Sequence, residues 1–352
     1  MNSASSTINE IIKDAKNGKI FILVDNKDRE NEGDLVIPAS KVNAKKINFM
    51  AKHGRGLICL ALTQKKVKKL KLPLMSLINK SRTQTAFTVS IESKKGITTG
   101  ISAKDRAKTI KVAIQKSSSK KDIVSPGHVF PLVAKNGGVL ERAGHTEASV
   151  DISKLAKLNP SAVICEVMNE DGTMARYNDL IPFAKKHKLK IAKIEDLISY
   201  RLKHEKLIRL ISNKKINIKK FGSFDLKIFK NKLDGSEHYA ITKGKFSASK
   251  NPRVRVISTN ILNSFFNFKK NIFKSSLKYL NKFNNFALIL IKSTNPTSSS
   301  EDNRILRYYG IGAQIIKELR IKNMILVSRS KKRVIALKGY DIKITKQEII
   351  NE

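Results

Sequence analysis

Ten residues near the N-terminus concentrate carboxylates in an otherwise basic chain. Residues 25–34 read DNKDRENEGD, whereas the whole chain of 352 residues has a formal net charge of +41; the acidic residues are Asp25, Asp28, Glu30, Glu32 and Asp34. Crowded carboxylates repel one another unless a positive group lies among them, and the candidates are a divalent cation and Arg29. The alternative is a solvated hairpin tip, because runs of charge are usually exposed. The residues alone leave both interpretations open.

A second candidate site lies at residues 141–151, which read ERAGHTEASVD. The apolar spacing from 146 to 158 predicts a helix that begins at Gly144, His145 and Thr146. Unpaired backbone N–H groups at a helix start attract anions, and Arg142 and Thr146 add side-chain donors. A phosphate group would fit there. The alternative is an ordinary capped helix with a surface arginine.

Apolar runs on either side of the acidic segment predict that it is a loop between two buried strands, in which Gly33 permits the turn. Helical spacing and strand-like runs then alternate without long gaps, which favours a layered mixed α/β (α+β) domain over residues 1–204. The helices are expected at 6–18, 40–53, 103–115, 146–158 and 178–187 and from 194 towards 210. The strands are expected at 20–24, 35–38, 57–62, 86–91, 125–133 and 162–168.

Four segments, taken in order, resemble the signature segments of one enzyme family, 3,4-dihydroxy-2-butanone 4-phosphate synthase of riboflavin biosynthesis. They are DRENEGDL at 28–35, ERAGHTEASVD at 141–151, NPSAVICE at 159–166 and EDGTMAR at 170–176. The resemblance covers about residues 6–204. It implies a carbon–carbon lyase that converts D-ribulose 5-phosphate to 3,4-dihydroxy-2-butanone 4-phosphate and formate. The reaction would proceed by metal-assisted enolisation, dehydration and carbon rearrangement.

The resemblance also implies roles for individual residues. Glu30 and His145 would hold two divalent ions, Mg²⁺ or Mn²⁺, which suit oxygen ligands and one imidazole. His128 and Glu166 would be catalytic; from the residues alone, Glu166 ends a buried strand and suits either proton transfer or a buried ion pair. Substrate contacts would come from Arg29, Glu30, Asp34, Arg142, Ala143, Gly144, His145, Thr146 and Glu166. Weaker candidates are Cys59, Thr98, Thr99, Ser102, Asp105 and Arg106. A homodimer is expected, because the family's active site lies near a dimer interface.

The C-terminal part is similar to GTP cyclohydrolase II. NRILRYYGIGAQIIKEL at 303–319 and LKGYDI at 337–342 resemble its end, and Gly222, Phe224 and His238 fit its beginning. A second, smaller α/β domain is therefore expected over residues 205–352. Its helices are expected at 274–281 and 310–320, and its strands at 221–229, 238–242, 253–258, 286–291 and 324–328.

This second domain departs from the family at the residues that carry its chemistry. Cyclohydrolase catalysis requires zinc held by three cysteines spaced C-x10-C-x-C, but the chain contains only Cys59 and Cys165. Asn260 and Asn271 cannot replace thiolate ligands. NPTSSSED at 295–302 stands in place of a glycine-rich segment, and Ile305 in place of an acid. We expect no zinc and a folded domain that is inactive as a cyclohydrolase, with a role in dimerisation, stability or partner docking.

The basic composition predicts attraction to anions rather than a specific nucleic-acid partner. The sequence pI is near 10.2, yet lysine is spread along the chain, tryptophan is absent, and no helix-turn-helix or RNA-recognition pattern occurs. A general bias towards Lys, Asn and Ile explains the charge. Phosphorylated metabolites would still be attracted.

The chain shows neither an apolar run of about 18 residues, which a membrane span needs, nor a signal pattern at its start, so no membrane partner and a cytoplasmic location are expected. Two alternatives to a monofunctional lyase stay open. One is a bifunctional enzyme that retains GTP cyclohydrolase II activity. The other is a basic nucleic-acid-binding or regulatory protein on an inactive enzyme scaffold.

Overall fold

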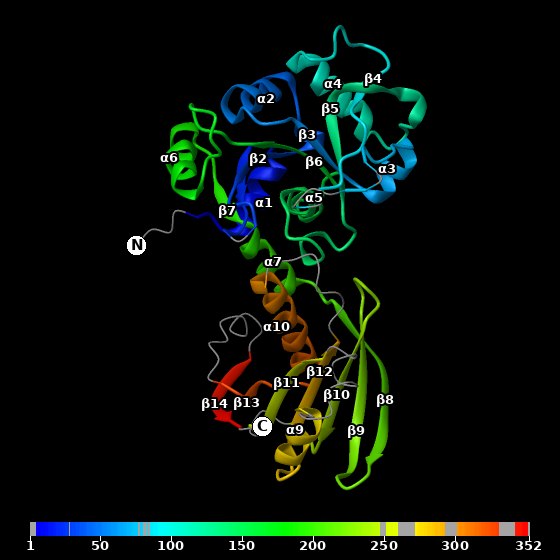
Figure 1. Ribbon diagram of the computed structural model, residues 1–352, viewed down its shortest axis with the longest axis vertical. Coiled ribbons are helices and arrows are strands. Elements are labelled where there is room, and N and C mark those ends of the chain that lie inside the picture. Colours follow the sequence, from blue (N-terminus) through cyan, green and yellow to red (C-terminus); the bar gives the residue numbers. More distant parts are fainter. Residues whose placement is uncertain are drawn as a thin grey trace. The chain divides into compact units, whose positions relative to one another are not determined.

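The structure, a computed structural model, describes residues 5–27, 29–76, 78–79, 83, 85–246, 251–259, 272–292, 301–330 and 342–350. The chain forms two compact units, Met1–Ile198 and Ser199–Glu352 (Figure 1). The division falls within helix α7 (Ile194–His204), and the boundary expected from the sequence, after residue 204, is the end of this helix. Among the described residues, no helix is both long and apolar enough to cross a bilayer.

The first unit is built on a mixed sheet of seven strands in the order β4-β5-β3-β6-β2-β1-β7. β3 pairs with β5, and β1 with β7, in parallel, whereas the other neighbours are antiparallel. The strands are β1 (Phe21–Val24), β2 (Gly33–Pro38), β3 (Cys59–Thr63), β4 (Ile91–Ser93), β5 (Ile123–Ala134), β6 (Ser161–Glu166) and β7 (Ile191–Lys193). This arrangement confirms the mixed α/β class.

Helices cover both faces of this sheet. Successive side chains of β3 point to opposite faces, and both sets are buried. Leu60 and Leu62 belong to the large core with Ile47 of α2 and Ile110 of α4, while Ala61 packs with Val150 of α5 on the opposite face. The helices are α1 (Ile8–Lys16), α2 (Ala44–Phe49), α3 (Gln64–Leu70), α4 (Ala103–Ile114), α5 (His145–Leu155) and α6 (Tyr177–His187). The expected helix 40–53 is instead a 3₁₀ turn, α2 and a π turn at Met50–Gly54.

The acidic segment connects β1 to β2, as expected, but Gly33 does not make the turn. Gly33 lies in β2, where a Cβ would meet the end of the Leu180 side chain at 2.3 Å, so the glycine lets α6 pack closely on this strand. The left-handed backbone is at Asn31, with φ 55°. Asparagine tolerates this conformation because its short polar side chain can bond locally.

The second unit contains another seven-stranded sheet, ordered β14-β13-β11-β12-β10-β9-β8. Its strands are β8 (Ile208–Ile218), β9 (Gly222–Asn231), β10 (Glu237–Lys243), β11 (Arg253–Thr259), β12 (Phe286–Lys292), β13 (Asn323–Ser328) and β14 (Lys343–Ile349), and its helices are α9 (Ile272–Leu280) and α10 (Glu301–Glu318). Leu277 and Leu280 of α9 pack against Phe286 and Leu288.

Several elements differ from expectation. The helix predicted to run towards residue 210 ends at His204, and residues 208–218 form β8, whose side chains are mostly exposed. The strand expected at 86–91 is instead the short β4 at Ile91–Ser93, and the helix expected at 310–320 is α10, which begins at Glu301. β7, β14 and α3 were not predicted. β8 and β14 are partly solvated and rich in lysine, so they lack the apolar alternation that identifies a strand.

Candidate active site

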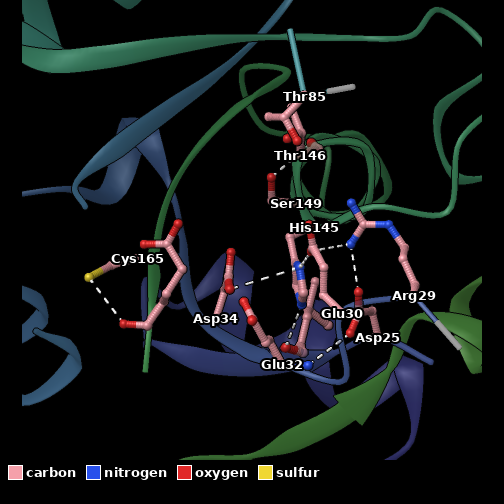
Figure 2. A network of polar contacts seen from close by, with 12 residues as sticks. Asp25, Arg29, Glu30, Glu32, Asp34, Thr85, His145, Thr146, Ser149 and Cys165 are labelled. Atoms are coloured by element: carbon pink, nitrogen blue, oxygen red, sulfur yellow. Dashed lines mark hydrogen bonds and ion pairs between the residues drawn. The ribbon is translucent and has the colours of Figure 1, made fainter. Parts of the chain in front are cut away.

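Four chain segments meet at one end of the first sheet: the acidic loop, the start of β2, the end of β6 and the start of α5. Figure 2 shows Glu30, Asp34 and His145 directed towards one another. Register places Asp34 opposite Glu166 across β2 and β6. The structure therefore brings together the two predicted metal ligands and two further predicted site residues.

Arg29 lies among the acidic side chains, as the crowding of carboxylates predicts. Its Nη1 donates to Asp25 Oδ2 at 2.6 Å and also to Glu30 Oε2. Asp25 is buried, and its other oxygen accepts the Glu32 backbone N–H at 2.9 Å. Although burial opposes the charge, the neighbouring Glu30 and Asp25 raise the pKa of Arg29. The loop is thus internally bonded and is not a fully solvated tip.

The imidazole of His145 faces two carboxylates from its Nδ1 side. Nδ1 lies 3.9 Å from Glu30 Oε2 and 3.9 Å from Asp34 Oδ1. Nε2 lies 3.2 Å from the Leu23 carbonyl oxygen, which only accepts, so the ring proton belongs on Nε2. Burial lowers the pKa of His145, so the neutral ring is favoured. Its Nδ1 lone pair then points at negative oxygens, an arrangement that a cation between them would stabilise.

A cation fits the donor set at this point. Ligand atoms of Asp25, Glu30 and His145 all lie within 4.8 Å of one another. The 3.9 Å separation of Glu30 from His145 is too long for a hydrogen bond, and it is short enough for both side chains to contact one divalent ion. Two carboxylates with one imidazole suit Mg²⁺ or Mn²⁺.

The carboxylates of Asp34 and Glu32 lie close to other negative charges. Burial, followed by the charges of Glu166 and Glu30, raises the pKa of Asp34 well above its usual range. Burial also raises the pKa of Glu32, with Glu30 adding to the effect. Such mutual repulsion is what a bound cation relieves.

The start of α5 has the features of an anion site. Its N-cap is Gly144, which offers no side-chain hydrogen bond to the helix. Arg142 is held beside it: Nη1 donates to Glu147 Oε2 at 2.7 Å, and Nη2 donates to the Thr83 carbonyl and to Thr85 Oγ1. Glu147 is buried, and this burial raises its pKa despite the arginine. The guanidinium charge is therefore fixed near the open helix end.

Glu166 is held by the backbone beside β3. Its Oε2 accepts the Leu57 N–H at 2.8 Å. A Cβ on Gly56 would lie 2.5 Å from the same oxygen and 2.6 Å from the Glu166 carbonyl. A glycine is required here, because any side chain would displace the carboxylate.

His128 lies apart from this group within the chain. β3 aligns Cys59 with Phe130 on one side and with Ile164 on the other. Extending that register by two residues places His128 two strand spacings, roughly 10 Å, from Glu166. The partner of His128 is Glu92 of β4, whose carboxylate contacts Nδ1.

Most of the weaker candidates serve local structure. Asp105 accepts from Thr98 Oγ1 at 2.6 Å, and its backbone N–H donates to Ser102 Oγ, the N-cap of α4. Burial raises the pKa of Cys59 far above its usual range, which argues against a reactive thiol. Arg106 differs, because its buried Nε has no hydrogen-bond partner among the described residues. No interaction in the described part of the chain assigns Thr99 a role.

Sequence reasoning missed three residues of the site. Asp25 was noted as acidic but not as a ligand candidate. Arg176, at the end of the EDGTMAR segment, donates from Nη1 to the backbone oxygens of Glu30 at 2.6 Å and Asn31 at 2.9 Å. Glu92 gave no signal beyond a charge in a strand, since its pairing with His128 depends on the β4–β5 register.

Comparisons with known families agree with the resemblances found for the N-terminal and C-terminal parts of the chain. Residues 9–200 match the model of the 3,4-dihydroxy-2-butanone 4-phosphate synthase family, and residues 209–297 and 274–348 match the GTP cyclohydrolase II model. A protein of Photobacterium phosphoreum named 3,4-dihydroxy-2-butanone 4-phosphate synthase is 42% identical, with 96% of this chain and 98% of that protein covered. The riboflavin biosynthesis protein RibBA of Aquifex aeolicus is also 42% identical, with 97% of this chain and 91% of that protein covered.

Solved structures give the same result. RibBX of A. baumannii, described as a two-domain 3,4-dihydroxy-2-butanone 4-phosphate synthase, is 38% identical with a TM-score of 0.84, covering 99% of this chain and all of that one. A synthase structure described as a complex with two magnesium ions is 38% identical with a TM-score of 0.54, and it covers 56% of this chain and 98% of that one.

Proposed function

The chain belongs to the 3,4-dihydroxy-2-butanone 4-phosphate synthase family, and from this membership we propose how its residues divide the work of the reaction. The protein is a 3,4-dihydroxy-2-butanone 4-phosphate synthase of riboflavin biosynthesis with a C-terminal GTP cyclohydrolase II-like domain. The family implies D-ribulose 5-phosphate as substrate. The products are the four-carbon phosphate and formate.

Glu30 and His145 are the proposed ligands of divalent metal, with Asp25 as a further ligand of the same cluster. The supporting observation is the convergence of these three side chains from the acidic loop and α5. The related structure with two magnesium ions supports two ions in each site, and the donor set admits Mg²⁺ or Mn²⁺. Divalent cations supply a Lewis acid beside the substrate oxygens.

Asp34, Glu166 and His128 are the proposed proton carriers. Asp34 and Glu166 are adjacent across two strands, and burial together with the neighbouring carboxylates raises the pKa of Asp34, which favours its protonated form. Leu57 and Gly56 fix the direction of the Glu166 carboxylate. Glu92 holds Nδ1 of His128 and leaves Nε2 to exchange a proton.

The start of α5 is the proposed site of the substrate phosphate. Backbone N–H groups at Ala143, His145 and Thr146, the Thr146 hydroxyl and the fixed charge of Arg142 favour an anion, whereas the Gly144 N–H donates to the Arg142 carbonyl oxygen and would contribute to substrate contact through its position alone. Arg29 completes the substrate contacts from the acidic loop. The phosphate would be held next to the proposed metal ligands, because His145 belongs to both groups.

We propose a homodimer in the cytoplasm, with no membrane or specific nucleic-acid partner. The homodimer is proposed from the family, whose active site lies near a dimer interface. The alternative of a nucleic-acid-binding protein predicts tight, salt-sensitive binding and no turnover. Mass photometry and a salt titration with DNA or RNA test both statements.

The second unit is proposed to lack cyclohydrolase activity and zinc. No cysteine follows Cys165, and the buried His238 accepts the Lys292 backbone N–H at Nδ1, 3.2 Å away. Asn260, Asn271, the segment 295–300 and residues 337–341 lie outside the described residues. Release of formate and pyrophosphate from GTP by the purified protein, together with bound zinc, would favour the bifunctional alternative.

The convergence of Glu30, Asp34 and His145 beside Glu166 carries the assignment. A coupled assay with ribulose 5-phosphate and Mg²⁺ tests it. The wild type should form the four-carbon phosphate and formate, whereas Glu30→Gln and His145→Ala should lose at least about 10²-fold in rate. Equal turnover by all three proteins would refute the assigned roles.

A further inference from the structure

A cavity of about 380 Å³ lies beside the acidic loop, at the ends of β1 and β7. This volume is within the range of small-molecule sites. None of the residues assigned above to substrate, proton transfer or phosphate lines it, and Asp25 is the one member of the proposed metal cluster at its wall. The cavity is therefore distinct from the proposed substrate site.

Positive side chains from three separate parts of the chain line this cavity: Lys27, Arg176 and Lys193. The carboxylates in its wall are already engaged, because Asp25 pairs with Arg29 at 2.6 Å and Glu195 pairs with Lys193 at 3.4 Å. Lys27 forms no ion pair among the described residues. Arg176 lies 3.7 Å from Glu32, and Arg29 compensates Asp25, so Lys27 is the cation in excess of the carboxylates and an anion is favoured beside it.

The remaining lining suits a ligand with hydroxyl groups. Asn26, Asn31 and Asn178 provide amide donors and acceptors, and the Lys193 ammonium lies 5.5 Å from the centroid of the Tyr177 ring. Amides with ammonium and guanidinium groups match the oxygens of a sugar phosphate or a similar phosphate monoester.

Arg176 connects this cavity to the acidic loop. The nitrogen Nη1 donates to the Glu30 and Asn31 carbonyl oxygens and lies 3.7 Å from Glu32 Oε1. These contacts use one of the three guanidinium nitrogens. An anion beside Arg176 and Asn31 would therefore tie the loop, including the left-handed Asn31, to the start of α6.

We propose that this cavity binds a small phosphate monoester and that its occupation stabilises the acidic loop in the conformation that holds the cation. The proposed binding of the phosphate monoester depends only on the residues that line the cavity. The effect on cation affinity rests on the proposed function, because it requires the metal site at Glu30 and His145. By linkage, the cation must strengthen binding of the anion by the same factor.

Calorimetric titration with glucose 6-phosphate, without divalent metal and with glucose as the neutral control, tests the binding. The wild type should bind glucose 6-phosphate and not glucose. Lys27→Ala/Lys193→Ala should weaken binding by about tenfold or more, through loss of charge-assisted contacts. Lys27 is exposed and the Lys193 side chain is 44% exposed, and circular dichroism checks that the variant folds.

Two controls separate the cavity from other anion sites. Lys185→Ala/Lys186→Ala removes the same charge from exposed positions at the far end of α6 and should bind as the wild type does. Arg142→Ala, at the proposed substrate phosphate site, should also retain binding. Absence of binding to the wild type at millimolar concentration, or loss in Arg142→Ala but not in Lys27→Ala/Lys193→Ala, would overturn the proposal.

Mn²⁺ affinity, measured with and without glucose 6-phosphate, tests the coupling. The sugar phosphate should tighten Mn²⁺ binding several-fold in the wild type but not in Lys27→Ala/Lys193→Ala. Unchanged Mn²⁺ affinity with intact sugar-phosphate binding would overturn the coupling alone. Absence of any Mn²⁺ binding would instead contradict the proposed metal site, while calorimetry would still report on the cavity.

Discussion

Oε2 of Glu30 and Nδ1 of His145 lie 3.9 Å apart, although one residue belongs to the loop after β1 and the other begins α5. The Leu23 carbonyl fixes the tautomer of His145 from within β1, the strand that leads into the acidic loop. Strand β1 therefore positions both sides of the proposed metal site. Any change that moves the end of β1 should alter both ligands together.

Replacement of Glu92 should impair catalysis through His128. In Glu92→Gln the carboxylate that contacts Nδ1 becomes a neutral amide, which orients the imidazole more weakly. We expect kcat to fall by about tenfold to a hundredfold. Lys95→Ala, an exposed change close by, is the control. An unchanged kcat would show that Glu92 has no part in the function of His128.

Gly56→Ala should displace Glu166. The new Cβ would lie 2.5 Å from Oε2 and 2.6 Å from the backbone oxygen, so the carboxylate and its strand must move. We expect a loss of roughly a hundredfold in kcat, the effect of a misplacement of about 1 Å. Gly312→Ala is the matched control, because its nearest atoms lie 3.4 Å away. Full activity of Gly56→Ala would argue against a precise role for Glu166.

A pair of histidines should make the first unit less stable as the pH is lowered. His53 and His187 lie with ring centroids 4.6 Å apart. Burial lowers the pKa of both; Lys52, Lys186 and Arg55 add to the effect at His53, and His53 and Lys186 at His187. The unfolded chain therefore binds protons more readily, and stability declines as pH falls through about 6.5.

Urea unfolding between about pH 8 and pH 5 measures this decline. The variant His53→Gln/His187→Gln should lose less stability than the wild type over that interval. Phe49 and Phe183, which also contact His187, remain in both proteins. Identical pH slopes would mean that the pair does not titrate as argued.

Gln314→Ala should destabilise the second unit. The buried Gln314 amide donates to the Leu202 and Glu205 carbonyl oxygens, each at 2.8 Å, and accepts the Leu207 N–H at 2.9 Å. Its removal leaves these backbone groups without that partner, at a cost of about 3 kcal/mol. Chemical unfolding should show this loss, whereas Lys317→Ala, exposed on the same helix, should change stability little. Equal stabilities would contradict the role of this side chain.

Patterns in the sequence predicted those parts of the molecule that depend on local periodicity. Apolar runs identified β1 and β2, and therefore the acidic loop, and the charge pattern predicted that Arg29 lies among the carboxylates. Resemblance, rather than spacing, paired Glu30 with His145. β8 escaped prediction because the side chains of an exposed edge strand carry little apolar signal.

Contacts that depend on tertiary arrangement could not be predicted in the same way. Glu92 meets His128 only through the register of β4 and β5, and Arg176 reaches backbone oxygens that carry no side-chain signature. The turn at Asn31 and the packing role of Gly33 likewise required knowledge of where α6 lies.

Direct titration with Mn²⁺, followed by electron paramagnetic resonance, tests the central claim that Glu30 and His145 hold the catalytic cation. The wild type should bind Mn²⁺ competitively with Mg²⁺, whereas Glu30→Gln and His145→Ala should each bind at least about tenfold more weakly while remaining folded. Wild-type Mn²⁺ affinity in both variants would contradict the claim.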